Sequence, residues 1–450
     1  MERKKTILMI ANSDTAMNGF LALQECFENM KNIRCITVCH KRVHVENAIK
    51  RCDIPRERIS VIYFDSQKSR GAKRNQEDYQ YKPDIMPVAV CKALLNVIKM
   101  VLGNLDGMGK AYRIIKETNP SVILLYADNR AEFEKYFIFW AKRKQIKTVV
   151  APICFSSVEG VLDNPTNGFR LDAGSGLPLS AKIIRRLVPG QERIVGTQRI
   201  FYKQPFAAIV DCIMHLSAPY PWVQGSLADI VCTSYQAEYE EIVRELGDGV
   251  KEKLFLTDAI EDDVIFQGYK NRDGIKRYLS DKYDVDTETV AIVAFSERNE
   301  RISRDNDLYD KDIIVRSILK YYPSVFISLH PRSNVEENRF LEQYEGSCIL
   351  EEPLRKVIAA ADVIVYGDVS SVGRWVEMLG IKHVTWTSYS MWEKWSTDMT
   401  EEFQDRIVKM KKEQEAVSLN GETVKISSLE GNGKQDLQRP RFADLLLNLL

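Results

Sequence analysis

The sequence lacks several features that would place it in a special class of protein. No window of its 450 residues stays apolar long enough to span a membrane, and the apolar run at residues 7–11 is too short for a signal peptide. Lysine plus arginine and aspartate plus glutamate number 63 each, so the net charge gives no case for nucleic acid as a partner. These absences predict a soluble protein of the cytoplasm.

The cysteine pattern excludes two further classes of protein. The nine cysteines include no CxxC pair, so neither a structural zinc site nor a disulfide framework is predicted. Most of them lie inside apolar runs, which favours reduced thiols in a core. We therefore expect no metal ion and no bound cofactor.

Short apolar runs instead alternate with helical patterns along most of the chain. Strands are predicted at residues 6–11, 33–39, 59–64, 121–126, 147–153, 228–233, 253–257, 289–295, 325–328, 348–350, 362–366 and 383–386. Strands that alternate with helices form parallel sheets through right-handed crossovers. Since 450 residues exceed one ordinary core, we predict an α/β protein with two Rossmann-like domains facing a central cleft. The expected domains are residues 1–257 and 258–435, with a hinge at 257–270 and a C-terminal helix at 436–450.

Two stretches depart from this alternation. A long helix is predicted over residues 87–117, with a break at the glycines of 103–109. The region 155–225 is rich in glycine, proline and basic residues, and we interpret it as an insertion near 160–225 in the first domain. Its basic and apolar character between 180 and 225 suits peripheral contact with a membrane surface, and it equally suits a helical subdomain with a solvated face.

Two polar loops follow buried strands in the second half of the chain. His330, Pro331 and Arg332 come after the strand at 325–328, and Ser370 and Ser371 begin a helix after the strand at 362–366. In an open parallel sheet, ligands bind beyond the carboxyl ends of the strands, and helix N-termini there favour anions. A histidine and an arginine add donors for phosphate oxygens. The pair of loops predicts a phosphate-bearing ligand such as a nucleotide, although either serine alone is also an ordinary helix cap.

Three further side chains belong to this predicted pocket. Ser296 and Arg298 follow the strand at 289–295, and Arg298 is placed to cover a phosphate or to be a plain surface charge. Glu377 lies nearly two turns along the helix that begins at Ser371, where it would reach ribose hydroxyls or face solvent.

The first half offers two carboxylates for general base catalysis. Glu159 follows the strand at 147–153 and precedes a glycine, and Asp128 follows the strand at 121–126. A base at either position would accept the proton of an attacking hydroxyl. The ordinary alternative for both is a helix cap or a solvated turn.

The chain resembles the GT-B glycosyltransferases, most sharply over residues 228–390. SLHPRS at 328–333 and DVSSVGRWVEMLG at 368–380 resemble the His-Pro and Ser-Ser motifs of bacterial sialyltransferases, Kdo transferases and CDP-glycerol glycerophosphotransferases. VEG at 158–160 resembles the acidic-Gly motif of the sialyltransferases, with Val158 in place of its first acidic residue. It also resembles the His-x-Glu-Ala-Gly stretch of UDP-N-acetylglucosamine 2-epimerases, with Ser157 in place of the histidine.

The resemblance implies a metal-independent transferase that moves a sugar from a nucleotide-linked donor, CMP- or CDP-activated rather than UDP-activated. His330, Ser370 and Ser371 would hold the donor phosphate, and His330 would also assist its departure. The acceptor would be a hydroxyl of a surface polysaccharide or of a lipid-linked glycan at the inner face of the membrane. Two alternatives remain open: an epimerase acting on UDP-N-acetylglucosamine, and a non-catalytic GT-B binding protein.

Overall fold

The computed structural model describes residues 4–27, 30–52, 59–64, 86–129, 133–153, 158, 162, 169–174, 176–295, 304–330, 333–367, 370, 372–386 and 441–450. The chain divides into two compact units. Unit 1 comprises Met1–Lys50, Ile54–Ile260 and Pro440–Leu450, and unit 2 comprises Arg51–Asp53 and Glu261–Arg439. The last segment therefore belongs with unit 1.

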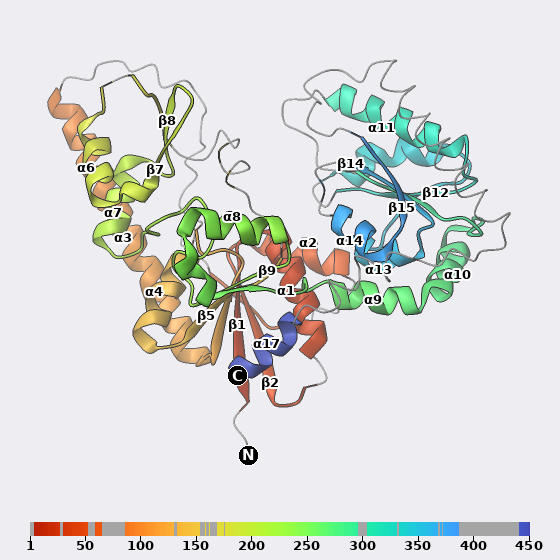
Figure 1. Cartoon of the computed structure of the whole chain (residues 1–450), viewed down its shortest axis with the longest axis horizontal. Helices are drawn as coiled ribbons and strands as arrows, with labels where there is room; N and C mark the ends of the chain where they lie inside the picture. The colour runs from red at the N-terminus through yellow and green to blue at the C-terminus, as the bar shows by residue number, and fades with distance from the viewer. Residues whose placement is uncertain are drawn as a thin grey trace. The chain divides into compact units, whose positions relative to one another are not determined.

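Unit 1 contains a seven-stranded parallel sheet with the order β10-β9-β5-β4-β1-β2-β3 (Figure 1). Its strands are β1 (Lys5–Ala11), β2 (Ile33–Cys39), β3 (Val61–Tyr63), β4 (Val122–Leu125), β5 (Lys147–Val150), β9 (Ile230–Thr233) and β10 (Leu254–Leu256). From β1 the chain builds outward first through β2 and β3, and then returns to add β4 on the other side. The boundary between β1 and β4 is therefore the switch point of this Rossmann-like sheet.

Helices cover both faces of this sheet. Alternate residues of a strand point to opposite sides, so these strands place apolar side chains on both faces. Leu8, Ile10 and Leu125 share one core with α3 (Met86–Thr118), α4 (Glu134–Lys144) and α8 (Gln236–Leu246). The helix α1 (Asp14–Phe27) packs on β1 and β2, and α2 (Arg42–Cys52) connects β2 to β3. The helix α17 (Phe442–Leu449) is held at its start by a hydrogen bond from the Phe442 N–H to Asp258 Oδ1, 2.6 Å long.

The long helix α3 is continuous, so the predicted break at residues 103–109 is wrong. Gly103 and Gly109 have no neighbouring atom within 4 Å of an added Cβ. At Gly107 such a Cβ would lie 2.4 Å from the ring of Tyr136 on α4. The helix keeps its hydrogen bonds, and the missing side chain at Gly107 lets α4 pack closely on α3.

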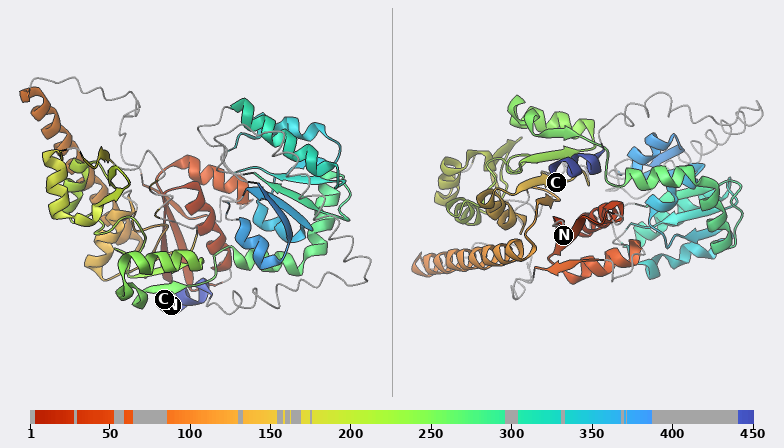
Figure 2. Two further views of the ribbon diagram at one scale, coloured as in Figure 1. Left: turned by 45° about the horizontal axis from the view of Figure 1, so that its top comes forward. Right: turned by 90° about the horizontal axis from the view of Figure 1, so that it is seen from below.

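The insertion in unit 1 is a small subdomain with both helices and strands. The strands β6 (Phe169–Asp172), β8 (Gln198–Phe201) and β7 (Glu192–Val195) form an antiparallel sheet in that order. The helices α6 (Leu179–Leu187) and α7 (Pro205–Ile213) are joined to it by a small core that includes Ile184 and Phe201. It lies beside α3 in all three ribbon views, and α7 packs directly on α3 (Figure 2).

Unit 2 contains a five-stranded parallel sheet with the order β13-β12-β11-β14-β15. Its strands are β11 (Ala291–Ala294), β12 (Val325–Ser328), β13 (Ser347–Ile349), β14 (Val363–Gly367) and β15 (Lys382–Trp386). One face packs on α9 (Asp262–Lys270), α10 (Arg272–Tyr283), α13 (Leu354–Val357) and α14 (Val372–Leu379). The other face packs on α11 (Arg304–Leu319) and on the turn at Arg339–Gln343 that follows α12 (Val335–Asn338).

Two parallel sheets, each covered by helices, confirm the predicted α/β class with two Rossmann-like domains. The change from one unit to the other falls at Ile260 and Glu261. Much of the expected hinge at 257–270 is occupied by α9, which packs on α13 within unit 2. The domain boundary expected at 435/436 lies outside the described residues.

Candidate functional site

The carboxyl ends of three strands meet at one edge of the unit 2 sheet. Ala294 of β11 is in register with Ser328 of β12 on one side and with Tyr366 of β14 on the other. The chain leaves these strands toward the same edge because all three are parallel. His330 and Ser370 therefore follow the two strands that flank β11, at the edge where open parallel sheets bind ligands.

Ser370 caps the start of α14. Its hydroxyl oxygen accepts a hydrogen bond from the Val372 N–H, with an N–O distance of 3.3 Å, and its carbonyl accepts one from Gly373 at 3.2 Å. The cap fixes the direction of the helix and leaves the N-terminal turn at the edge of the sheet. Ser370 thus has an ordinary structural role at the position where the sequence predicts a phosphate contact.

Tyr366 lies beneath this turn and was missed by the sequence analysis. An added Cβ at Gly373 would come within 3.2 Å of the Tyr366 hydroxyl oxygen, so the missing side chain allows the close approach. Burial, with a further contribution from the Glu377 carboxylate, raises the pKa of Tyr366. The hydroxyl is a hydrogen-bond donor beside the start of α14. Only an aromatic residue at the end of an apolar run marks it in the sequence.

His330 is half-buried just beyond β12, and its carbonyl accepts a hydrogen bond from the Ser333 N–H at 2.8 Å. Glu377 is exposed on α14, which is compatible with either of its two predicted roles. The remaining predicted members of the pocket lie outside the described residues: Ser296, Arg298, Pro331, Arg332 and Ser371.

A buried lysine near the same edge was also missed. Lys311 on α11 is 4% exposed, and its ammonium donates to Asn338 Oδ1 at 3.1 Å. The ammonium lies 5.7 Å from the ring centre of Phe295, which directly follows β11. A positive charge therefore lies close to the carboxyl end of the central strand. The sequence gives no signal for it, because Lys311 stands in a run of exposed-looking charges.

Two ion pairs anchor the start of unit 2 beneath α14. Arg374 pairs with Asp262, and Arg355 pairs with Glu261 at 3.3 Å. Burial raises the pKa of Glu261, although the Arg355 guanidinium acts against this shift. The sequence analysis assigned these acidic residues only to the hinge, whereas they hold the start of α9 to α13 and α14.

Asp128 has a structural role, which corrects its prediction as a general base. The side chain is 1% exposed. Its Oδ1 accepts a hydrogen bond from the Gly225 N–H, and its Oδ2 accepts two from the Leu227 and Ala228 N–H groups, all at 2.8 Å. Both oxygens are thus used to hold the segment that leads into β9, and neither is presented to a substrate.

Glu159, the other predicted base, lies outside the described residues. The preceding residue, Val158, is buried, and its N–H donates to Glu241 Oε2 on α8 at 3.3 Å. This hydrogen bond anchors the backbone at Val158, next to Glu159, to α8.

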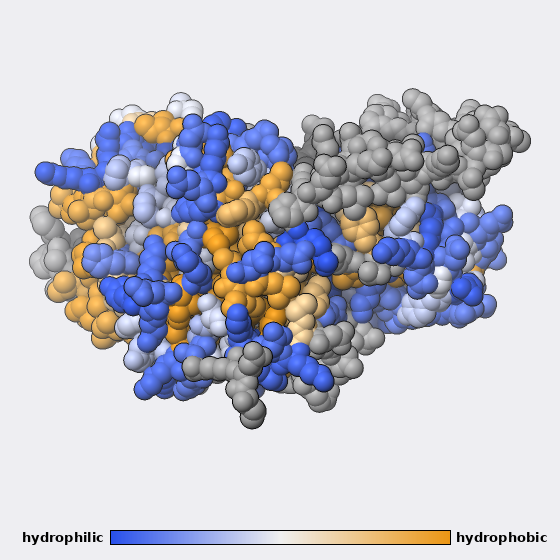
Figure 3. Space-filling view, turned by 60° about the horizontal axis from the view of Figure 1, so that its bottom comes forward, coloured by the Kyte–Doolittle hydropathy of each residue, from blue (hydrophilic) through white to orange (hydrophobic). Residues whose placement is uncertain are grey.

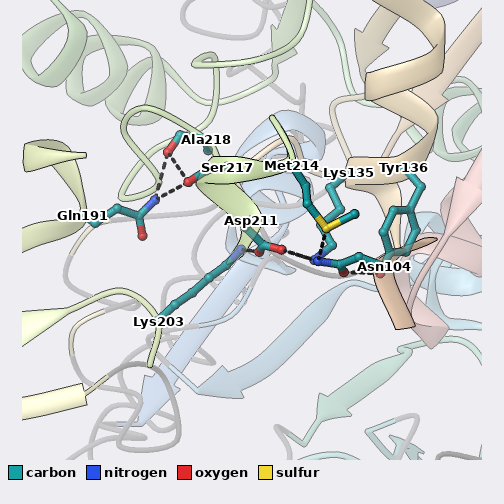
Figure 4. Close-up of polar contacts among 9 residues, drawn as sticks. All are labelled: Asn104, Lys135, Tyr136, Gln191, Lys203, Asp211, Met214, Ser217 and Ala218. Carbon is teal, nitrogen blue, oxygen red and sulfur yellow. Dashed lines mark hydrogen bonds and ion pairs between the residues drawn. The ribbon is translucent and has the colours of Figure 1, made fainter. Parts of the chain in front are cut away.

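A second polar cluster ties the insertion to the main body of unit 1 (Figure 4). Asp211 on α7 accepts hydrogen bonds from Lys203 at 2.6 Å, from Lys135 on α4 at 2.8 Å, and from Asn104 on α3 at 3.0 Å. Tyr136 donates in turn to Asn104 Oδ1 at 2.8 Å. The three helices that meet here, α3, α4 and α7, come from distant parts of the sequence.

Burial and the neighbouring charges shift the pKa values of Asp211 and Lys203. Burial opposes the charged form of Asp211, but the Lys203 and Lys135 ammonium groups outweigh it and lower its pKa. Burial lowers the pKa of Lys203, and the Asp211 carboxylate partly offsets that shift. The cluster is an ion pair network that fastens α7, and all of its carboxylate oxygens are occupied.

Within the described ranges, no group of three His, Cys, Asp or Glu side chains is placed to hold a metal ion. Six cysteines in those ranges are free thiols: Cys26, Cys35, Cys39, Cys212, Cys232 and Cys348. Among the helices that the structure describes, none combines the length and the apolar composition needed to cross a bilayer.

No protein-family model matches the sequence, and no curated protein matches it. Among solved structures, the glycotransferase of kitacinnamycin is similar over 100% of both chains, with a TM-score of 0.51 and 12% identity. At this identity the likeness concerns the fold alone.

Two other solved structures are similar at lower TM-scores. Spinosyn rhamnosyltransferase SpnG has a TM-score of 0.49 at 10% identity and covers 99% of each chain. A UDP-GlcNAc 2-epimerase from Neisseria meningitidis, bound to UDP-GlcNAc, has a TM-score of 0.48 at 10% identity and covers 98% of each chain. These two likenesses support no conclusion about function.

Proposed function

We propose that this protein is a GT-B type glycosyltransferase that moves a sugar from a nucleotide-linked donor to an acceptor hydroxyl. The observation that carries the proposal is the edge of the unit 2 sheet. There the capped start of α14 and the turn at His330 follow the two parallel strands on either side of β11, near the buried charge of Lys311. Backbone N–H groups at a helix start, together with nearby cations, are suited to a phosphate.

The donor phosphates would lie over the N-terminal turn of α14. His330 and the Ser370 hydroxyl would donate to the phosphate oxygens, with Ser371, Arg332, Ser296 and Arg298 as further contacts. These donors would stabilise the negative charge that develops on the departing nucleotide, without a metal ion. Glu377 would contact the ribose hydroxyls. The sequence motifs favour a CMP- or CDP-linked donor.

Glu159 is the proposed general base, because Asp128 is committed to three backbone N–H groups. The acceptor would be a hydroxyl of a surface polysaccharide or a lipid-linked glycan. The reaction would use no resident cofactor, since the donor is itself the nucleotide-bearing substrate.

Calorimetric titration of the full chain with CMP, CDP and UDP tests the donor site directly. We expect at least one nucleotide to bind, while the matching nucleosides cytidine and uridine bind far more weakly because they lack phosphate. Absence of heat with all three nucleotides at millimolar concentration would contradict the proposal and favour a non-catalytic binding protein. Turnover of UDP-N-acetylglucosamine without an acceptor would instead identify an epimerase.

Contact with an anionic membrane surface at the cytoplasmic face is a separate part of the proposal. It is supported by α6, whose exposed surface carries Leu179, Ile183 and Leu187 together with Lys182 and Arg186. The helix contains no acidic residue, and its opposite side is buried through Ala181 and Ile184. Such a face suits the boundary between lipid headgroups and acyl chains.

Other exposed apolar side chains gather near α6. Phe206 and Ile213 on α7, and Ile194 and Val195 on β7, are exposed in the same subdomain. Leu94, Leu95, Ile98, Leu102 and Leu105 form an exposed stripe on the neighbouring helix α3. Apolar surface lies among hydrophilic surface over unit 1 in Figure 3. The concentration of such residues in one subdomain is typical of an interaction surface.

A further inference from the structure

One side of the helix α3 is apolar and exposed. Its apolar residues are between 46% and 60% exposed at Leu95, Ile98, Leu102 and Leu105, and 37% exposed at Tyr112. The opposite side of α3 packs on α4 and α7 and holds the buried residues Asn104 and Ala111. In the right view of Figure 2, α3 (orange, far left) runs along the outer edge of unit 1. The helix therefore presents an apolar side to its surroundings.

The exposed residues follow the spacing of a coiled-coil seam. Positions 95, 98, 102, 105, 109 and 112 succeed each other at intervals that alternate between three and four residues. We call these positions the α3 seam. Such heptad spacing keeps apolar side chains facing a single partner helix that crosses at a shallow angle. At Gly109 an added Cβ would meet no atom within 4 Å, so the seam has room there for a side chain of a partner.

Charges of both signs flank the α3 seam. Lys99 and Asp106 are exposed and lie seven residues apart, so they occupy the same side of the seam. Asp106 forms an ion pair with Lys110 at 2.7 Å, yet 52% of its side chain stays exposed. A helix on an anionic membrane carries basic residues beside its apolar face, as α6 does. An exposed aspartate beside the α3 seam instead suits a protein partner that offers a lysine, and α3 itself offers one.

We propose that α3 pairs with the α3 of a second copy of the chain. The two helices run antiparallel, with a twofold axis at residues 103–104. Leu102 then packs on Leu105 of the partner subunit at the centre of the interface. Lys99 forms an ion pair with Asp106 of the partner subunit, and the axis repeats each contact. The pairing concerns unit 1 and does not depend on the proposed transferase activity.

The same register matches the sizes of the remaining seam residues. Ile98 lies against Gly109 of the partner subunit and occupies the open space there. Leu95 packs on the ring of Tyr112 of the partner subunit at each end of the pair. The contact extends over residues 95–112, about 26 Å of each helix. Every position of the α3 seam therefore meets a complementary position of the second copy.

Other arrangements of the two helices are less favourable. A parallel pair would place Gly109 against Gly109 of the partner subunit and leave a void. It would also set Lys99 beside the apolar Leu94 of the partner subunit. Asp106 would likewise lie beside Val101 of the partner subunit. Shifting the antiparallel pair by one heptad brings Lys99 against Lys99 of the partner subunit in one direction, and Asp106 against Asp106 of the partner subunit in the other. Like charges at such positions oppose pairing.

Sedimentation velocity of the full chain at concentrations from about 1 to 100 μM tests the interface. We expect the wild type to dimerise in this range. Leu102→Glu/Leu105→Glu puts carboxylates into the centre of the helix pair and should weaken dimerisation about a hundredfold or more. The matched control is Leu179→Glu/Leu187→Glu, which makes the same substitutions at two exposed leucines of α6. The control should dimerise like the wild type.

A charge exchange tests the antiparallel register. Lys99→Glu and Asp106→Lys should each weaken dimerisation about tenfold, because each sets like charges against each other across the interface. The double variant Lys99→Glu/Asp106→Lys should restore dimerisation to near the wild-type level, since the two positions meet only in the antiparallel pair. In solutions dilute enough to hold monomers, all of these variants should unfold at the urea concentration of the wild type, because the substituted side chains are exposed.

Several results would overturn the proposal. A wild type that stays monomeric at about 100 μM excludes the dimer. If Leu102→Glu/Leu105→Glu then loses binding to phosphatidylglycerol vesicles, the seam is a lipid contact. A dimer that survives this variant, or that is lost in the α6 control instead, has its interface elsewhere. Failure of the charge exchange to restore dimerisation contradicts the antiparallel register. Lower stability of Leu102→Glu/Leu105→Glu in dilute solution would show that these leucines pack within the chain.

Discussion

The Arg374 guanidinium on α14 donates hydrogen bonds from both terminal nitrogens to the two carboxylate oxygens of Asp262, the first residue of α9. The two side chains are 9% and 4% exposed. A bidentate pair of this kind fixes orientation as well as distance. It therefore holds the helix that begins at the proposed phosphate site against the first helix of unit 2.

Removing one partner of this pair should destabilise unit 2 strongly. We expect Arg374→Met to lower the free energy of unfolding by about 3–5 kcal/mol, because the buried Asp262 carboxylate loses its main counter-charge. The double variant Asp262→Leu/Arg374→Met should recover most of this loss, since it removes both charges. Urea unfolding followed by fluorescence measures both. Equal stability of Arg374→Met and wild type would show that the pair contributes little.

His330→Ala tests the centre of the proposed donor site. Loss of a hydrogen bond to a charged phosphate should weaken nucleotide binding by about tenfold or more, with little change in unfolding, because the side chain is only half-buried. Ser370→Ala should weaken binding and also cost about 1 kcal/mol of stability through loss of the cap on α14. Ser370→Gly is the matched control, because glycine keeps most of the capping preference while removing the hydroxyl. Calorimetry that finds unchanged nucleotide affinity in His330→Ala removes the histidine from the site.

Asp128→Asn distinguishes an anchor from a catalytic base. An amide retains one acceptor oxygen and turns an NH₂ group toward backbone N–H donors, so we expect a loss of about 2–4 kcal/mol in the free energy of unfolding. A base exposed to substrate would show the opposite pattern, with normal stability and lost turnover. Thermal and urea unfolding of the variant decide between the two roles.

The Asp211 network should make stability depend on pH below about 4. The pKa of Asp211 in the folded chain lies below its ordinary value of 3.8, so in acid the folded chain binds fewer protons than the unfolded chain. The charged Asp211 carboxylate therefore contributes its full stabilisation above the ordinary pKa. This stabilisation is lost as the pH falls through the folded-state pKa.

At pH 7, we expect the free energy of unfolding of Asp211→Asn to be about 3–5 kcal/mol lower than that of the wild type, because Lys203 and Lys135 lose their counter-charge. This difference from the wild type should narrow as the pH falls from 4 toward the lowest pH at which both proteins still fold. Urea titrations of both proteins across this range measure it. A difference that stays constant or widens in acid would show that Asp211 is not charged at neutral pH.

Vesicle binding tests the surface of α6. We expect the full chain to sediment with vesicles that contain phosphatidylglycerol and not with pure phosphatidylcholine, and salt to weaken the interaction. Leu179→Ser/Leu187→Ser removes two side chains that are 74% and 51% exposed, and Lys182→Glu/Arg186→Glu reverses two basic charges. Each double variant should bind about tenfold more weakly, with unchanged unfolding.

The matched control for the charge reversal is Lys31→Glu/Lys142→Glu, since these exposed lysines of unit 1 lie outside the insertion. This variant should bind like the wild type. No sedimentation with anionic vesicles would rule out the surface as a lipid contact. A wild type that self-associates, with α6 variants that become monomeric, would assign it to a second copy of the chain.

Local sequence patterns were sufficient to predict an element when its own residues mark where it begins and ends. The strands at 33–39 and 325–328 were predicted with the bounds that the structure gives them. Both are short apolar runs that polar residues follow directly in the sequence. By contrast, the glycines of α3 suggested a break, because the close packing of Tyr136 on Gly107 involves a residue from another helix.

Only those residues of the candidate site that a local sequence pattern marks could be predicted. His330 and Ser370 were identified because each follows an apolar run that forms a strand. Lys311 and Tyr366 were missed because their surroundings come from other elements. Asp128 was misassigned because its donors, at residues 225–228, lie far along the chain.

The α/β class, the two Rossmann-like units and most strands could be predicted from the sequence, because apolar periodicity and loop polarity are local properties of the chain. The tertiary structure was needed to show which strands are neighbours, and hence that His330 and Ser370 flank β11 and that β1 lies beside β4. It also decided which polar groups are engaged and which lack a partner. Residues from distant positions in the sequence bury each other and form hydrogen bonds with each other, and the order of the strands determines which residues come together.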